Sequence, residues 1–419
     1  ITGNSGVGIA VYDGYLDGMT FYYNDIYGNA NNAYNYLGAP ANFEQNWWGS
    51  PIYATILASV GSDIDFIPWC SDATHTNCTL SYPVTETWVD DDWVGSSPGD
   101  LVGGHIFGHD AFATIQDGID GVTGSTVHVL AGTYVEDVTI DKALTLIGDG
   151  PSVTHLMPTG TAAAITVTAN DVSISQIEVT NTPQMVEGLR VNGATSGLTL
   201  DYVYFHNLGN NPGPGNAYGV VFSNSFTDLN VSNCEFVATN LGEYSRAIGI
   251  FAPNDLSLND FEVIDSKFEY LFVGIYLRSE IDGLYAEGNT FGPFELDDCN
   301  AAVAGIYIGD GSDDSFDLLN VTVTGNTFTD YGRGVYVWNY AANATIDNFV
   351  ISGNTFTNSI WSSAIRFILG LNGFEDYSIA GISVDDNSFT QDSDIGANVA
   401  LVDFRTYDAT LLSCNISVT

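Results

Sequence analysis

Short runs of alternating apolar and polar residues fill most of this chain. A typical run is GVYVW at 334–338, and similar runs of four to six residues are separated by Gly, Asn, Asp and Ser. Alternation with a period of two over such short segments is typical of β-strands and argues against helices. The pattern therefore predicts an all-β protein that is built from many short strands.

The predicted strands belong to a repeating unit. Each unit contains a β-branched residue, a Gly or Asx position, a small polar residue and an aromatic residue. The units are VSNCEF (231–236), VIDSKF (263–268), AEGNTF (286–291), VTGNTF (323–328), ISGNTF (351–356) and VDDNSF (384–389). Their aromatic residues lie 23 to 37 residues apart, and a second strand that begins at Gly or Ala follows each of the first five units. Such repeats predict a parallel β-helix, in which stacked coils share one core.

The segment at 109–150 resembles the start of a known group of proteins. It reads HDAFATIQDGIDGVTGSTVHVLAGTYVEDVTIDKALTLIGDG, and the group is the right-handed parallel β-helices of the pectin-lyase-like superfold. The resemblance covers about residues 105–419 and implies a short capping helix near 110–120. Asp110 is the expected N-cap, with Phe112, Ile115 and Ile119 on the helix face that covers the open end of the core.

The expected order of domains is unusual. FEQNWWGSP at 43–51 resembles a phrase near the far end of such β-helices, so residues 1–69 are interpreted as the C-terminal coils of one β-helix. Residues 70–104 are interpreted as an acidic linker, and residues 105–419 as the cap and main body of another β-helix. Joining the chain end to its start gives a continuous repeat, which predicts head-to-tail stacking of copies. The residues at this expected junction are Ile1, Thr2, Gly3, Asn4, Val418 and Thr419.

Cysteine spacing predicts one disulfide. Cys70 and Cys78 enclose a polar loop of a size that a disulfide can close, and such a bond indicates an oxidising compartment. Cys234, Cys299 and Cys414 lie among apolar strand residues and are expected to be buried thiols. No apolar run is long enough to span a bilayer.

The charge of the chain excludes several partners. Its 419 residues include 8 Lys and Arg against 51 Asp and Glu, a formal net charge of −43, so nucleic acids and anionic lipid surfaces would be repelled. The chain is 45% hydrophobic, which allows a large core and argues against disorder. A strongly acidic surface attracts cations such as calcium.

A calcium site is expected in the loop GDGSDDSFD. The candidate ligands are Asp310, Asp313, Asp314 and Asp317. A solvated acidic loop is the alternative, and VDDDW at 89–93 is a second candidate with the same alternative. His105 and His109 have the spacing of a metal pair, but ordinary surface or cap histidines are the interpretation that we prefer. Glycosylation motifs occur at Asn77, Asn230, Asn320, Asn343 and Asn415, although chance explains them equally well.

Aromatic residues and arginines are expected on one outer face. If the residue after each strand-initial Gly or Ala points into the core, the next residue points outward, and so does the one two positions further along. The expected binding surface contains Phe251, Tyr276, Arg278, Tyr307, Tyr336, Trp338 and Arg366. It would bind sugar rings or a neighbouring chain. The alternative is a self-stacking ladder that stiffens the sheet.

Known catalytic series are missing from the sequence. No polygalacturonase-like or pectin-methylesterase-like series and no GxSxG motif occur, so we expect a protein that is not an enzyme. The leading hypothesis is a secreted structural protein that builds a head-to-tail extracellular filament, stalk or adhesive array. The alternative is a carbohydrate-active enzyme, similar to polysaccharide lyases, or a carbohydrate-binding β-helix module. The expected partners are copies of the chain itself and a polysaccharide.

Overall fold

The structure is a computed structural model that contains two compact units, residues 1–132 and 133–419. It describes residues 1–12, 21–36, 41–61, 64–80, 82, 84–160, 163–180, 187–193, 195–209, 216–238, 246–293, 303–309, 317–339, 344–358, 363–369, 377–390, 401–406 and 411–418. We call the two units the N-terminal unit and the main body.

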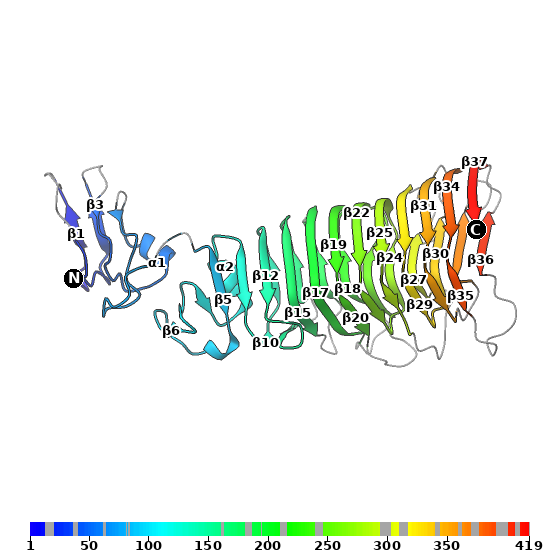
Figure 1. The fold of residues 1–419 in the computed structure, drawn as a ribbon. Coiled ribbons are helices and arrows are strands. Elements are labelled where there is room, and N and C mark those ends of the chain that lie inside the picture. The colour runs from blue at the N-terminus through cyan, green and yellow to red at the C-terminus, as the bar shows by residue number, and fades with distance from the viewer. Residues whose placement is uncertain are drawn as a thin grey trace. The chain divides into compact units, whose positions relative to one another are not determined.

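The described part of the N-terminal unit consists of short strands, two α-helices and one 3-10 helix (Figure 1). Its elements are β1 (Val7–Val11), β2 (Asn31–Asn35), β3 (Ala41–Asn42), α1 (Tyr53–Leu57), β4 (Ile64–Asp65), β5 (Glu86–Val89), the 3-10 helix η1 (Asp91–Trp93), β6 (Leu101–Val102), β7 (His105–Ile106), β8 (Ala111–Phe112), α2 (Ile115–Gly121) and β9 (Thr126–Val129). The pairs β1–β2, β3–β4, β5–β8 and β5–β9 are parallel, whereas β6–β7 is antiparallel.

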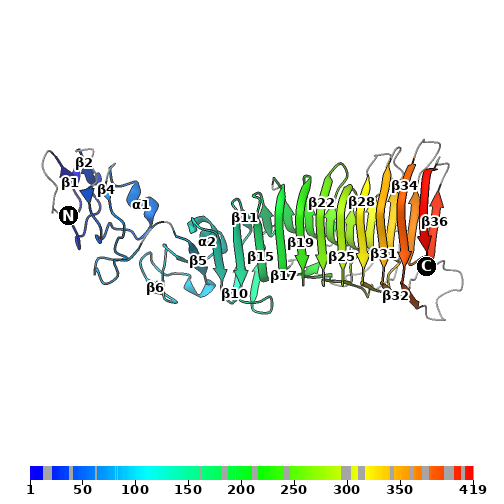
Figure 2. The same cartoon turned by 45° about the horizontal axis from the view of Figure 1, so that its top comes forward.

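The main body consists of stacked parallel strands in two long sheets (Figures 1 and 2). The first, here called the long sheet, contains β10 (Gly132–Val135), β12 (Leu144–Gly148), β13 (Thr154–Met157), β15 (Val172–Thr180), β17 (Ser196–Leu208), β19 (Phe226–Ser232), β20 (Glu235–Ala238), β22 (Ser257–Ile264), β23 (Lys267–Glu269), β25 (Glu280–Glu287), β26 (Thr290–Phe291), β28 (Leu318–Thr324), β29 (Thr327–Thr329), β31 (Thr345–Ser352), β32 (Thr355–Thr357), β34 (Tyr377–Asp385), β35 (Ser388–Thr390) and β37 (Leu411–Val418). The second, here called the groove sheet, contains β11 (Val138–Ile140), β14 (Ile165–Val167), β16 (Glu187–Val191), β18 (Asn216–Phe222), β21 (Arg246–Ala252), β24 (Val273–Leu277), β27 (Ala304–Gly309), β30 (Arg333–Asn339), β33 (Ile365–Leu369) and β36 (Val402–Thr406). This arrangement confirms the predicted parallel β-helix.

From β19 to β36, each coil contributes two strands to the long sheet and one strand to the groove sheet. One coil runs through β25, β26 and β27, and the next coil runs through β28, β29 and β30. The coils stack in register, with Ala286 opposite Val323 and Ile306 opposite Val335. Apolar residues that recur once per coil therefore lie above one another in a continuous core.

The aromatic residues of the repeating unit form one stack inside this core. Consecutive rings are 4.8 to 5.2 Å apart and nearly parallel. The stacked rings are those of Phe236, Phe268, Phe291, Phe328, Phe356 and Phe389. The glycine on the groove-sheet strand of the preceding coil leaves space for each of the first five rings, since a Cβ atom at Gly305 would lie 2.6 Å from the ring of Phe328. This contact explains why the sequence repeats Gly at that position.

A ladder of polar side chains runs through the turn two residues before each Phe. The backbone N–H of each ladder residue donates to the side-chain oxygen of its equivalent in the next coil, over 2.9 to 3.1 Å. The ladder contains Cys234, Ser266, Asn289, Asn326, Asn354 and Asn387. Asn326 Nδ2 also donates to the backbone carbonyl oxygens of Ala286 and Thr324. The ladder thus satisfies buried backbone groups that would otherwise destabilise each turn.

Helix α2 begins later than predicted. Its N-cap is Thr114, whose side chain accepts a hydrogen bond from the first turn, so the expected N-cap Asp110 is wrong. Asp110 instead accepts hydrogen bonds from the His105 ring and from the Ile106 backbone N–H. Phe112 lies in β8, before the helix, whereas Ile119 is fully buried as predicted.

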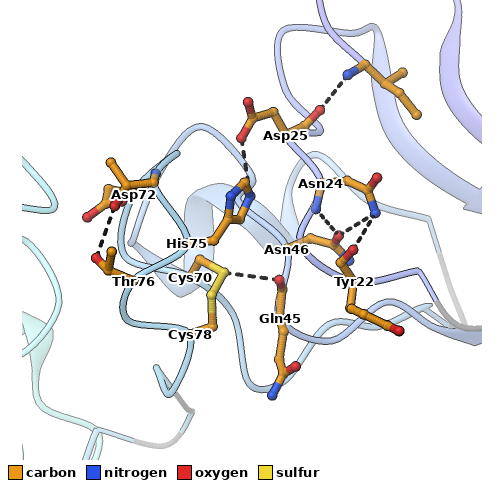
Figure 3. Close-up of polar contacts among 12 residues, drawn as sticks. Tyr22, Asn24, Asp25, Gln45, Asn46, Cys70, Asp72, His75, Thr76 and Cys78 are labelled. Carbon is orange, nitrogen blue, oxygen red and sulfur yellow. Dashed lines mark hydrogen bonds and ion pairs between the residues drawn. A yellow bond between two sulfur atoms is a disulfide. The ribbon is translucent and has the colours of Figure 1, made fainter.

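The predicted disulfide between Cys70 and Cys78 is present (Figure 3). The loop between these cysteines carries His75, whose Nε2 lies 3.3 Å from a carboxylate oxygen of Asp25. Within the expected linker, residues 86–89 form β5, which pairs with β9. Cys234 is a buried thiol as predicted, and burial raises its pKa to about 12. Cys299 lies outside the described residues, and nothing is described of the Cys414 side chain.

Replacing a ladder asparagine should destabilise the main body. Asn326→Ala would leave the backbone and side-chain N–H groups of Asn289 without their acceptor. It would also leave the carbonyl oxygens of Ala286 and Thr324 without a donor. We expect the free energy of unfolding to fall by about 2–4 kcal/mol. Urea denaturation measures this loss. Thr322→Ala, which truncates a half-buried side chain on β28, is the control and should change stability by less than about 0.5 kcal/mol. Equal effects of the two changes would contradict the role of the ladder.

A row of histidines and carboxylates crosses the outer face of the long sheet. Glu178 accepts hydrogen bonds from His155 and His206, and His206 also lies 3.4 Å from Glu235. The hydrogen bond from His206 lowers the pKa of Glu178. Burial alone would lower the pKa of His206, but its hydrogen bonds and charge interactions with Glu178 and Glu235 outweigh burial and raise it.

The stability gained from His206 should disappear at alkaline pH. Folding raises the pKa of His206, so its contribution is complete below the unfolded value of about 6.5 and is lost as pH rises through the folded value. The contribution of Glu178 is lost only as pH falls through its lowered pKa, below about 4.3. We therefore expect His206→Gln to cost more stability at about pH 5.5 than at about pH 8.5. A pH-independent cost in urea denaturation would contradict this account.

Candidate functional site

A groove of about 570 Å³ lies on the outer face of the groove sheet. Polar, aromatic and basic side chains line it together. The lining residues are Asn216, Arg246, Ile248, Phe272, Tyr276, Arg278, Tyr307, Arg333, Tyr336, Trp338, Arg366 and Ile368. Six of the seven residues of the predicted binding surface are among them, and Tyr276 packs against the seventh, Phe251.

Strand register arranges the groove as three rows that run along the stack of coils. The middle row contains Phe251, Tyr276, Tyr307, Tyr336 and Arg366. The row on its N-terminal side contains Tyr218, Ile248, Val273, Ala304 and Arg333. The row on its C-terminal side contains Gly309, Trp338, Ile368 and Arg405. Neighbouring coils in such a sheet lie about 4.8 Å apart, so each row is a regular series of side chains.

The tyrosines of the middle row are more buried than predicted. The rings of Tyr276 and Tyr307 stack at 4.5 Å, and those of Tyr307 and Tyr336 stack at 4.7 Å. Tyr307 and Tyr336 are each only 3% exposed, so the expectation that they stand outside the sheet as open sugar-binding faces is wrong. Each ring face is covered by the next ring, which supports our alternative of a self-stacking ladder for this row.

Arginines lie beside the rings of this row. Arg333 and Arg366, at the end that we call the basic end, lie 4.4 and 6.0 Å from the ring centre of Tyr336, and Arg278 lies 5.9 Å from that of Tyr276. Such distances allow cation–π attraction. Arg333 is 4% exposed, and burial lowers its pKa from the ordinary value; the nearby charges of Arg366 and Arg405 lower it further.

Sequence reasoning missed the position of Arg333. Gly334 and Val335 both face the core, since a Cβ atom on Gly334 would meet the Phe356 ring and Val335 is fully buried. The alternation of the strand therefore shifts at the glycine, and Arg333 faces the groove. The residues before Gly249, Gly274, Gly305 and Gly334 form one row, which is a signal that the sequence does contain.

A carboxylate lies next to the basic end. Asp403 on β36 lies opposite Arg366 on β33, with a carboxylate oxygen 3.4 Å from its Nε. The same carboxylate lies 2.9 Å from Arg405. These contacts hold two guanidinium groups close to the groove in an otherwise acidic chain.

The expected metal residues are only partly described. Asp310, Asp313 and Asp314 lie outside the described residues, and Asp317 accepts a hydrogen bond from the Thr345 backbone N–H. Within the described ranges, no group of three or more His, Cys, Asp or Glu side chains is placed to hold a metal. Calcium at 310–317 stays a prediction.

The two histidines considered as a metal pair have separate partners. His105 stacks on Trp88 at 3.9 Å and contacts Asp110. His109 lies edge-on to Trp69, and burial lowers its pKa. Both imidazole rings thus pack against tryptophan rings.

The glycosylation motifs have varied surroundings. Asn77 accepts a hydrogen bond from Thr79, Asn230 donates to Glu262, and Asn320 donates to Asp282. Asn343 lies outside the described residues, and nothing is described of the Asn415 side chain. Their modification stays a prediction.

The residues of the expected head-to-tail junction lie in different units. Asn4 donates to Asn29, and Gly3 and Thr2 lie beside Tyr27. The backbone of Val418 belongs to β37, and Thr419 is outside the described residues. The junction stays a prediction. No helix among the described residues is both long and apolar enough to cross a bilayer.

Comparison with known proteins shows the fold. No protein-family model matches the sequence, and no curated protein matches it. Among solved structures, alginate lyase from Paenibacillus sp. str. FPU-7 has a TM-score of 0.43 and 12% identity, covering 70% of this chain and 96% of that protein. The enzymatically active domain of tailspike protein 2 from bacteriophage CBA120 has a TM-score of 0.44 and 16% identity. The match covers 81% of this chain and 48% of that protein. Pectin methylesterase from carrot has a TM-score of 0.37 and 12% identity, covering 78% and 89%.

This chain therefore spans about half the length of the tailspike domain that it matches. The strand topology confirms the predicted parallel β-helix with a short helix near its start, and these solved structures have a similar fold.

Our expectation that the chain is not an enzyme is corrected by these comparisons. The similar structures include an alginate lyase, pectin methylesterases and an α-1,3-glucanase. The lack of a known catalytic series therefore does not separate this chain from enzymes of that fold. The structural filament hypothesis gains no support, and our alternative of a carbohydrate-active protein agrees better with the findings.

Truncating a tyrosine of the middle row should destabilise the protein. The arrangement predicted from the sequence, with these tyrosines exposed, did not imply such a loss of stability. Tyr307 is buried between two stacked rings, so Tyr307→Ala should cost about 2–4 kcal/mol in the free energy of unfolding. The matched control is Tyr285→Ala on the long sheet, where the ring is half-exposed and the cost should stay below about 1 kcal/mol. Urea denaturation would contradict the buried ladder if both changes had the same small effect.

Proposed function

We propose that this chain is a carbohydrate-active β-helix protein and that a polysaccharide binds in the groove on the outer face of the groove sheet. The observation that carries the proposal is the groove itself, which combines aromatic and hydrogen-bonding side chains in an elongated hollow. Polysaccharides have both apolar faces and many hydroxyl groups, and sites with convergent polar groups on an aromatic surface suit such ligands.

The rows of the groove favour an extended ligand over a compact one. The side chains repeat along the coil axis from β21 to β33, so equivalent contacts recur at each coil. Trp338 lies in the row beside the tyrosine ladder, is half-buried, and contacts the Tyr336 ring at 5.8 Å. We infer that Trp338 contributes apolar contact area where the stacked tyrosines do not.

The disulfide supports a location outside the cell. Disulfides such as Cys70–Cys78 form and persist in oxidising compartments, where an extracellular polysaccharide is accessible. The similar structures whose names include alginate lyase, pectin methylesterase and α-1,3-glucanase share the fold, but the substrate of this chain is inferred from its own groove.

Binding and turnover assays test this proposal. A set of acidic and neutral polysaccharides is titrated against the full chain while Trp338 fluorescence or calorimetric heat is followed. We expect at least one to bind, and Trp338→Ala to weaken that binding about tenfold or more, because truncated aromatic anchors typically have such effects. Tyr285→Ala, on the other sheet, should leave affinity unchanged. Release of reducing ends or unsaturated sugars shows whether bound polysaccharide is also cleaved.

The proposal fails if no polysaccharide binds, or if Trp338→Ala and Tyr285→Ala bind equally well.

A further inference from the structure

The groove is a basic region in a strongly acidic chain. The chain has 8 Lys and Arg residues against 51 Asp and Glu residues. Four arginines line the groove, and the described lining residues include no Asp or Glu. A fifth, Arg405, lies in the same row as Trp338 and Ile368. The charged lining residues are thus opposite in sign to the net charge of the chain, and Asp403 beside them pairs with Arg366 and Arg405.

The stacked tyrosines leave few open aromatic faces in the groove. Tyr307 is covered on both sides, by Tyr276 at 4.5 Å and by Tyr336 at 4.7 Å. A ligand above this row therefore meets ring edges and neighbouring guanidinium groups. Recognition by charge and hydrogen bonds is accordingly favoured over stacking on the tyrosines.

Arginines line both ends of the groove. Arg246 and Arg278 lie with Ile248 and Phe272 at the end formed by β21 and β24, and Arg333 and Arg366 line the end formed by β30 and β33. The guanidinium groups of Arg333 and Arg366 both lie within 6.0 Å of the ring centre of Tyr336. Burial and the charges of Arg366 and Arg405 both lower the pKa of Arg333, so a nearby anion would relieve like-charge repulsion there.

We propose that the polysaccharide bound in this groove carries carboxylate or sulfate groups, and that one such group binds at the basic end beside Arg333 and Arg366. This inference rests on the proposed function. Guanidinium groups donate paired hydrogen bonds to planar carboxylates and to sulfates. Arg333 and Arg366 thus select an anionic group, and the rest of the groove, which includes Arg246 and Arg278, accommodates the remaining sugar units.

The experiment compares three oligosaccharides of equal length: an oligouronate, a sulfated oligosaccharide and a neutral glucan oligosaccharide. Each is titrated against the full chain at low and high sodium chloride concentrations. We expect an acidic ligand to bind at least about tenfold more tightly than the neutral one at low salt and to lose that advantage at high salt. The two acidic probes separate carboxylate from sulfate recognition.

The variant Arg333→Gln tests the position of the anion. It should weaken the acidic ligand about tenfold or more and leave the neutral one unaffected, because charged hydrogen bonds are lost. Lys267→Gln is the control, since it removes one positive charge from the long sheet and should not change affinity. Circular dichroism reports whether Arg333→Gln still folds. If Arg333→Gln does not fold, the salt dependence of binding by the unaltered chain tests whether the groove prefers an anionic ligand.

Equal, salt-independent binding of neutral and acidic ligands would overturn this inference while leaving the proposed function intact. Preference for an acidic ligand with no effect of Arg333→Gln in a folded variant would also overturn it. Absence of binding by all three probes and by the wider polysaccharide set would refute the proposed function itself, and this inference with it.

Discussion

Hydrogen bonding at one buried turn is the constraint on which the rest of the main body depends. At this turn, a buried backbone N–H needs a hydrogen-bond acceptor that is not water. The side-chain oxygen of the equivalent residue in the next coil is that acceptor, and it belongs to Asn289, Asn326, Asn354 or Asn387. This link fixes the register of successive coils. In that register, the phenylalanines two residues later stack at about the spacing of strands in a sheet. Glycines on the facing strand then leave space for the rings.

The same register creates the outer face. Because coils cannot slip past one another, residues at equivalent positions line up as rows, and a repeated aromatic or basic residue becomes a continuous feature. Stacked tyrosines form the middle of the groove, and arginines line both of its ends. One set of inward contacts thus determines which side chains meet on the outside. The concentration of positive charge is a property of the stack and of no single coil.

Much of this fold could be predicted from the sequence, because its determinants are local and repeat. The six residues 323–328 contain the turn at Gly325, the ladder residue Asn326 and the core aromatic residue Phe328. Burial in the groove could not be predicted, because it depends on which coil lies beside Tyr307 and how closely the rings pack. Arg333 was left out of the predicted binding surface because strict alternation fails at Gly334. The N-cap was misassigned because Asp110 binds His105, a contact outside the helix.

A crystal structure of the full chain with an acidic oligosaccharide tests the central claim most directly. The account predicts that the sugar chain lies along the groove sheet, with a carboxylate or sulfate oxygen within hydrogen-bonding distance of the Arg333 or Arg366 guanidinium group. Density for the oligosaccharide on the long sheet, or in the groove with its anionic groups turned away from both arginines, would contradict it.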